Sequence, residues 1–170
     1  MISLRCSGKE PWATIERNLG LKGSVQPWDV YKVVVPRTDL NVRRGDVTVA
    51  PTFALSSWMA FEQVGDGVIA HGDLCLLERE VNPVMTELVS SGIEASALHN
   101  HLGGEEPRVM FLHFWGHGNA ARLAKTLRRA LDRAGGVPAP AQQVGSVPDQ
   151  AMIEKLIHQA GKVNAGVLQF

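Results

Sequence analysis

Two segments with the residue pattern of strands flank the strongest turn signal in the chain. The segments are 56–64 and 68–76, and Gly65-Asp66-Gly67 lies between them. Asp-Gly between two such segments favours a β-hairpin, because glycine adopts the positive φ that a tight turn requires. Both segments carry apolar residues at even and odd positions. This pattern predicts an antiparallel sheet that is covered on one side and partly covered on the other.

A helix and a second hairpin are expected to follow. Asn82 suits the N-cap and Pro83 the first position of a helix that Gly92 ends. Segments 93–102 and 108–116 are predicted strands on either side of a Gly-rich loop.

A further helix completes the predicted order. Apolar residues between Asn119 and Ala134 recur at helical spacing. The order from residue 68 is β-α-β-β-α, which resembles a ferredoxin-like unit. With a short helix at 11–20 and strands at 30–35 and 47–49, the prediction is an α+β fold. Its antiparallel sheet has helices packed on one face and extra N-terminal strands.

Charge and cysteine content exclude several classes of protein. The 170 residues carry 17 Lys plus Arg and 17 Asp plus Glu, and a net charge of zero argues against a nucleic-acid-binding protein. Cys6 and Cys75 are too few and too far apart for a disulfide framework. The sequence contains neither the apolar stretch of a signal peptide nor that of a membrane helix, which favours a cytoplasmic protein unless a leader was removed.

The chain shows a weak internal repeat. Ile15-Glu16-Arg17 and Gly23-Ser24-Val25 recur 138 residues later as Ile153-Glu154-Lys155 and Gly161-Lys162-Val163. The interpretation is a single domain at 1–145, with a Pro- and Gly-rich linker at 135–148. Residues 146–170 then form the end of that linker and a helix-strand stub that resembles the start of a second repeat. Chance similarity is the alternative. Such a stub needs a partner sheet in its own domain or in another subunit, which favours a homo-oligomer such as a homodimer.

Four of the six histidines lie between residues 99 and 117. His99 and His101 are two apart on one predicted strand, so they share a face, and His113 and His117 share a face of the next strand. If the hairpin pairs residues whose numbers sum to 212, His99 lies directly across from His113. A shift of one residue would move His113 to the other face.

Three imidazoles on rigid strands suit a divalent ion, most simply Zn²⁺, with a position left for water or substrate. Glu105, with Glu106 beside it, and His71 are candidates for a further ligand or for proton transfer. His117 is a candidate fourth ligand or proton donor. The alternative is that these histidines are half-exposed polar residues that bind nothing.

Four motifs resemble the LppY/LpqO family. They are Gly67-Val-Ile-Ala-His-Gly-Asp-Leu-Cys-Leu-Leu-Glu, Glu80-Val-Asn-Pro-Val-Met, Ala97-Leu-His-Asn-His-Leu and Pro107-Arg-Val-Met-Phe-Leu-His-Phe-Trp-Gly-His-Gly. The resemblance covers about residues 12–135. It implies a domain of uncharacterised function that is often exported or lipid-anchored and sometimes present twice. It also implies that His99, His101 and His113 lie at signature positions.

The expected function is therefore a metal-dependent hydrolase or lyase that acts on a small oxygen-rich substrate. The Arg-rich helix at 119–134 raises the possibility of an anionic substrate, although a solvated helix face explains the same charges. A non-catalytic module that binds a metal or small ligand is the alternative function. Neither nucleic acid nor a membrane is an expected partner.

Overall fold

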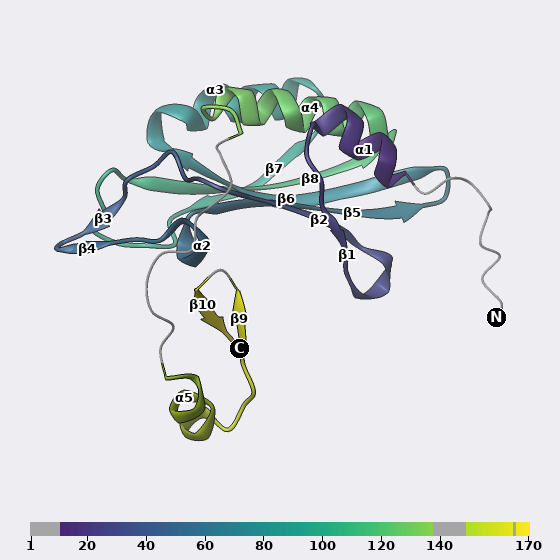
Figure 1. Ribbon diagram of the computed structural model, residues 1–170. Coiled ribbons are helices and arrows are strands. Elements are labelled where there is room, and N and C mark those ends of the chain that lie inside the picture. The colour runs from purple at the N-terminus through teal and green to yellow at the C-terminus, as the bar shows by residue number, and fades with distance from the viewer. Residues whose placement is uncertain (1–10, 138–148, 165) are drawn as a thin grey trace.

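The computed structural model describes residues 11–137, 149–164 and 166–170, and it has the predicted α+β architecture (Figure 1). The helices are α1 (Trp12–Leu19), α2 (Pro51–Ala54), α3 (Glu78–Ser90), α4 (Ala120–Arg133) and α5 (Gln150–Ile157), with a 3₁₀ turn at Pro27–Asp29. The strands are β1 (Ser24–Val25), β2 (Tyr31–Pro36), β3 (Arg43–Arg44), β4 (Val47–Thr48), β5 (Ser56–Val64), β6 (Gly67–Leu77), β7 (Glu94–His99), β8 (Val109–Gly118), β9 (Lys162–Asn164) and β10 (Val167–Gln169).

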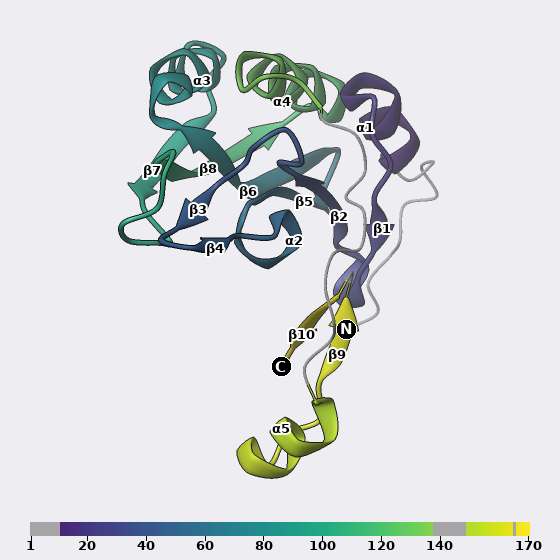
Figure 2. The same ribbon diagram turned by 60° about the vertical axis from the view of Figure 1, so that its left-hand side comes forward.

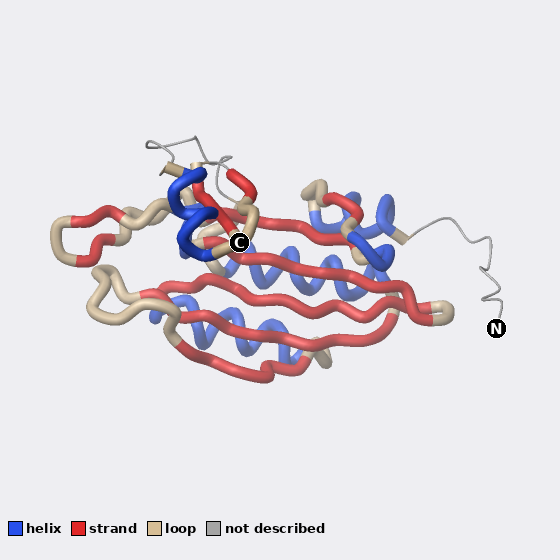
Figure 3. The backbone as a smooth tube through the Cα atoms, turned by 90° about the horizontal axis from the view of Figure 1, so that it is seen from below, coloured by secondary structure: helices blue, strands red, loops and turns tan. Residues whose placement is uncertain are grey.

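Six of these strands form one antiparallel sheet in the order β1-β2-β5-β6-β8-β7. Helices α1, α3 and α4 lie side by side on one face of it, as Figure 2 shows. We call the opposite face the open face, and Figure 3 looks onto it, with the strands in front of the helices. The open face carries the histidines discussed below.

The crossover through α3 determines which strands meet. Strand β6 leads through α3 to β7, and β8 then returns between the two, antiparallel to both. Residues of β8 therefore contact residues of β6 on one side and of β7 on the other. Side chains of β6 and β7 can therefore meet those of β8 on one face of the sheet.

The alternation of each strand separates a helix-side core from the open face. Large side chains such as Phe61, Leu74 and Phe114 are fully buried under the helices. A smaller second core lies on the open face at one end, where Val42, Val49 and Leu55 of the 37–55 segment pack against the sheet. Its sheet residues are Cys75, Leu77, Val109 and Phe111.

Helix α3 begins earlier than the sequence predicted. The expected start at Asn82 and Pro83 is wrong, because the helix begins at Glu78 and Pro83 lies inside it. The Glu80 carboxylate accepts a hydrogen bond from the Leu77 N–H (2.9 Å) and so caps the first turn. The same carboxylate pairs with the buried guanidinium of Arg37 (2.8 Å), which ties the start of the helix to the end of β2.

The C-terminal segment does not join the large sheet. Strands β9 and β10 pair with each other in a separate two-stranded sheet, so the stub is a helix followed by a hairpin that supplies its own partner strand. Cys6 and residues 138–148 of the predicted linker lie outside the described residues. Within the described ranges, no helix combines the length and apolarity that spanning a membrane requires.

Candidate metal centre

Two polar side chains face each other across the centre of the open face. Asp73 of β6 pairs directly with His113 of β8, and Trp58 of β5 pairs with Asp73 on its other side. Directly paired residues of antiparallel strands project toward the same face, so these three side chains form one row. Asp73 is buried in this row (3% exposed), whereas the His113 side chain remains 28% exposed.

A β-bulge brings His99 to the same face. At the start of β7, Glu94 pairs with Trp115, but the register shifts between Ala95 and Ala97, so that Ala97 pairs with His113. One extra residue reverses the alternation of a strand. Without the bulge, His99 would point to the helix side.

The predicted pairing of His99 with His113 is wrong, but both side chains lie on the open face, as predicted. His99 lies across from Phe111, a sum of 210 rather than 212, and is therefore diagonal to His113. The side chains nonetheless meet, because His99 Nε2 and His113 Nε2 are 2.7 Å apart.

His101 reaches the cluster from a loop and not from a strand. Strand β7 ends at His99, and the Asn100 side chain donates a hydrogen bond to the Val109 carbonyl (2.7 Å) at the start of β8. This anchor turns the chain back over the sheet, where the His101 ring stacks on Phe111 with centroids 3.5 Å apart. His101 Nε2 is then 3.6 Å from Asp73 Oδ2. The sequence missed Asn100 as the positioning residue, although its place between the two histidines was a usable signal.

Four side chains thus direct their polar ends to one point. The Nε2 atoms of His101 and His113 lie 3.6 and 3.9 Å from Asp73 Oδ2, and His99 Nε2 contacts His113 Nε2. Asp73 Oδ1 is fully buried and has no hydrogen-bond partner among the described residues. A buried carboxylate oxygen without a partner is costly and is usually explained by an ion or water. Asp73 is two residues from His71 on β6, so the two side chains share the open face.

The distances between these side chains do not match those of a metal site. Among residues 11–137, 149–164 and 166–170, no group of three or more His, Cys, Asp or Glu has a geometry that could hold an ion. The N–N distance of 2.7 Å between His99 and His113 is that of a hydrogen bond. Two nitrogen ligands about 2.0–2.1 Å from a tetrahedral zinc are separated by about 3.3–3.4 Å. The two nitrogens would have to part by roughly 0.6 Å to bind one zinc ion.

Burial is the largest influence on the pKa of His101. Burial lowers the pKa of this imidazole most strongly, the neighbouring Asp73 carboxylate opposes that change, and His99 and His113 lower the pKa further. The result is a pKa below its ordinary value. A neutral imidazole is the form that binds a metal ion.

His71 lies next to the cluster, one row further along the sheet. Its ring is 6.3 Å from that of His113 and lies between Trp58 (5.4 Å) and Trp115 (6.0 Å). Its Nδ1 is 2.9 Å from the Phe114 carbonyl oxygen, which can only accept a hydrogen bond. Nδ1 therefore carries the proton, and in the neutral ring Nε2 keeps the lone pair. The structure thus brings His71 close enough to serve the cluster.

Two other candidates are placed differently. The Glu105 carboxylate is buried and accepts a hydrogen bond from the Val109 N–H (3.3 Å), a contact that closes the loop between β7 and β8. Glu106 pairs its backbone with Arg43. His117 shares the open face but lies four residues along β8 from His113, a separation of roughly 13 Å. The structure does not bring His117 to the cluster.

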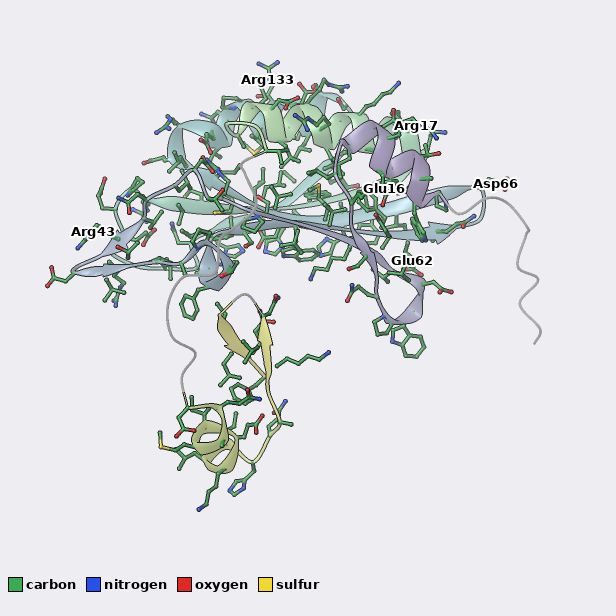
Figure 4. All side chains as sticks on the ribbon, in the orientation of Figure 1. Glu16, Arg17, Arg43, Glu62, Asp66 and Arg133 are labelled. Atoms are coloured by element: carbon green, nitrogen blue, oxygen red, sulfur yellow. The ribbon has the colours of Figure 1, made fainter. Side chains whose placement is uncertain are left out.

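Two further features can be assigned to packing. Burial raises the pKa of the Cys75 thiol to about 12, so this residue is a protonated component of the second core. The basic helix α4 covers the face opposite the histidines, and Figure 4 shows its Arg133 on the helix side, across the sheet from Glu62 on β5. The basic helix therefore does not line the cluster.

A family model described as Domain of Unknown Function (DUF1259) matches residues 13–133. The chain belongs to this family. All four converging side chains of the DUF1259 domain, and His71, lie within the matched range, whereas α5, β9 and β10 lie beyond it. Searches of the curated proteins and of the solved structures found no match to the chain. The resemblance to the LppY/LpqO family stays a prediction.

Proposed function

We propose that this DUF1259 domain binds a divalent metal ion, most simply Zn²⁺, through His99, His101, His113 and Asp73. The observation that carries the proposal is a cluster of three Nε2 atoms, two of them 3.6 and 3.9 Å from a buried carboxylate whose Oδ1 has no partner among the described residues. Imidazole nitrogens with one carboxylate oxygen form a ligand set suited to zinc and similar ions. A bound cation would also neutralise the buried Asp73 charge.

We further propose that the centre serves a hydrolase or lyase acting on a small oxygen-rich molecule. A zinc ion held there would act as a Lewis acid on a carbonyl or phosphoryl oxygen. His71 is positioned to move a proton, because its Nδ1–H is bound to Phe114 O and leaves Nε2 free to accept. Trp58 and Trp115 flank His71 and form apolar walls for a substrate on the open face. Glu105 is a weaker candidate for the base than His71, because its carboxylate accepts the Val109 N–H in the loop between β7 and β8.

A non-catalytic metal-binding module is the second candidate, and one observation favours it. Asp73 supplies a fourth protein ligand, and four protein ligands complete a tetrahedron with no position left for substrate. The two candidates therefore differ in whether the bound ion keeps an exchangeable position.

Titration of the metal-free chain with Zn²⁺ tests the proposal. We expect saturation at one ion per chain and a rise in melting temperature. At a free zinc concentration 100 times the dissociation constant, the gain in stability is about 2.7 kcal/mol. Binding of Co²⁺ in place of zinc then distinguishes the candidates, because adding a small anion such as azide changes the visible spectrum only where a ligand position is open. Saturation far from one ion per chain, or no binding, would contradict the proposed centre.

We expect the Asp73→Asn variant to stabilise the metal-free protein and to weaken its binding of zinc. Without metal, we expect it to be more stable than the native chain by about 1–3 kcal/mol, because the substitution removes a buried charge whose Oδ1 has no hydrogen-bond partner among the described residues. With metal, we expect its affinity for zinc to fall by about 10- to 100-fold, because an amide is a poorer ligand than a carboxylate. Urea unfolding with and without zinc measures both effects. Destabilisation of the metal-free variant would indicate instead that Asp73 stabilises the apo fold.

A further inference from the structure

Lys32 is the only lysine or arginine within the six strands of the large sheet. It lies on β2 and pairs directly with Ala60 of β5, which in turn pairs with His71 of β6. Directly paired residues project toward the same face, so Lys32 shares the open face with His71 and with the proposed metal ligands. The strands therefore place a single permanent positive charge on the face that carries the histidine cluster.

The ammonium group of Lys32 lies on the side of the cluster. Trp58 and Glu62 are the two diagonal neighbours of Lys32 on β5, two residues to either side of Ala60. Trp58 pairs with Asp73 and so lies in the row of the cluster, whereas Glu62 lies on the other side of Lys32, one row further away. Lys32 Nζ is 4.6 Å from the centroid of the Trp58 ring. The cation thus contacts its aromatic neighbour next to the cluster and does not pair with the carboxylate on the far side.

This contact leaves the ammonium group able to bind an oxyanion. A lysine ammonium has three N–H donors, and an aromatic ring attracts the charge without replacing an oxygen acceptor. Within the described part of the chain, no carboxylate or carbonyl oxygen is paired with Lys32 Nζ. Its donors are therefore available to a ligand that lies on the open face.

The surface between Lys32 and the cluster is lined by aromatic side chains. Trp58 contacts His71 edge to face, with ring centroids 5.4 Å apart, and the His71 ring is 6.3 Å from that of His113. Trp115, which is 43% exposed, lies 6.0 Å from His71. Apolar and aromatic walls with a few polar groups are typical of sites that bind small molecules.

The strand order gives the distance that a ligand would have to span. Lys32 is on β2 and Asp73 is on β6, with β5 between them. Two strand spacings amount to roughly 10 Å, and the Lys32 side chain covers part of this distance because it extends over Trp58. A molecule of a few carbon atoms with oxygen groups at both ends is long enough to reach Lys32 and the cluster together.

Two arginines contact the loop that carries His101, and both are engaged there. Arg44 Nε donates to the Gly103 carbonyl (2.7 Å), and Arg108 donates to Asn100 Oδ1 (3.2 Å). These contacts hold the loop, so Lys32 is the better candidate for binding a ligand.

We infer that the substrate of the centre is a small organic anion, and that Lys32 binds its oxyanion group at the end away from the metal. The inference rests on the proposed function, because the other end of the substrate occupies an open position of the metal ion. The oxyanion is a carboxylate or a phosphate, both of which accept hydrogen bonds from an ammonium group. Lys32 thereby determines specificity, since a neutral substrate of the same length would lack this contact.

Calorimetric titration of the zinc-loaded chain with dicarboxylates tests the inference. The probes are succinate, glutarate and adipate, each compared with the monocarboxylate of equal length, namely butyrate, valerate and caproate. We expect at least one dicarboxylate to bind about tenfold more tightly than its monocarboxylate, as one hydrogen bond between charged groups would provide. Lys32→Met should reduce this ratio to within about twofold, and Lys32→Arg should retain part of it. Repeating the titration with 3-phosphonopropionate shows whether Lys32 favours a carboxylate or a phosphate-like group.

Lys125→Met is the matched control, because Lys125 is an exposed lysine of α4 on the helix side. It removes the same charge and should leave the tenfold ratio unchanged. The melting temperature and the zinc affinity of the variants should match those of the native chain, because Lys32 and Lys125 are neither core residues nor metal ligands.

The zinc titration separates this inference from the proposed function. If the chain does not bind zinc, the proposed centre fails, and the inference fails with it. If zinc binds but no dicarboxylate is preferred over its monocarboxylate, the inference alone is overturned. It is also overturned if Lys32→Met and Lys125→Met reduce the preference equally.

Discussion

We expect His113→Ala to reduce zinc affinity at least about 100-fold, because it removes the central imidazole of the cluster. His113 contacts His99 at 2.7 Å, faces Asp73 across the strand pair and lies beside the ring of His71. Each of the other ligands remains in place in this variant. The zinc-dependent rise in melting temperature should therefore disappear at concentrations that saturate the native protein.

His117→Ala is the matched control for this prediction. His117 is on the same strand and the same face as His113 but is outside the cluster. We expect it to retain zinc binding within about twofold, because no ligand is removed. Elemental analysis and zinc titration of the native protein and both variants compare them directly. Equal zinc retention in all three proteins would show that His113 is not a ligand.

Arg37→Met is expected to destabilise the fold by about 3–5 kcal/mol, because it leaves the buried Glu80 carboxylate without its cation. Arg37 is 2% exposed, and its guanidinium donates to Glu80, to the Cys75 carbonyl (2.8 Å) and to Asp39 (2.8 Å). For a domain of this size, that loss lowers the melting temperature by roughly 10 °C.

Two variants separate the buried charge from general effects of removing an arginine. Adding Glu80→Gln to Arg37→Met should recover part of the lost stability, because the glutamine is neutral and can still accept the Leu77 N–H. Arg129→Met removes an exposed partner of Glu87 and should cost less than about 1 kcal/mol. If Arg37→Met is as mild as Arg129→Met, the buried pair does not hold α3 to the sheet.

The same network affects the dependence of stability on pH. Burial alone would raise the pKa of Asp39, but its hydrogen bonds and charge interaction with Arg37 more than offset burial and hold the pKa below its ordinary value. A depressed pKa contributes stability above the ordinary value, and this contribution is lost as the pH falls through the lower, folded value. The Arg37→Met variant should therefore show a flatter acid dependence in that range.

Local signals predicted most elements of the fold. The Gly65-Asp66-Gly67 turn and the apolar spacing of α4 appear where the sequence places them. Asn119 accepts the Arg122 N–H as an N-cap should. The start of α3 was missed, because Asn82 and Pro83 match the residue preferences of a helix start, whereas the first turn is closed earlier by the Glu80 carboxylate on the Leu77 N–H.

The sequence by itself determined the kinds of side chain available at the site and the strands that carry most of them. Only the tertiary structure decided which of them meet. The bulge between Ala95 and Ala97 keeps His99 on the open face, and the Asn100 anchor brings His101 back over Phe111. The crossover through α3 places β8 beside β6, which brings Asp73 into the cluster. His117 pairs with Ile69 further along β6 and stays outside the cluster. Strand order and register depend on packing across the whole sheet, so a pattern within one strand cannot specify them.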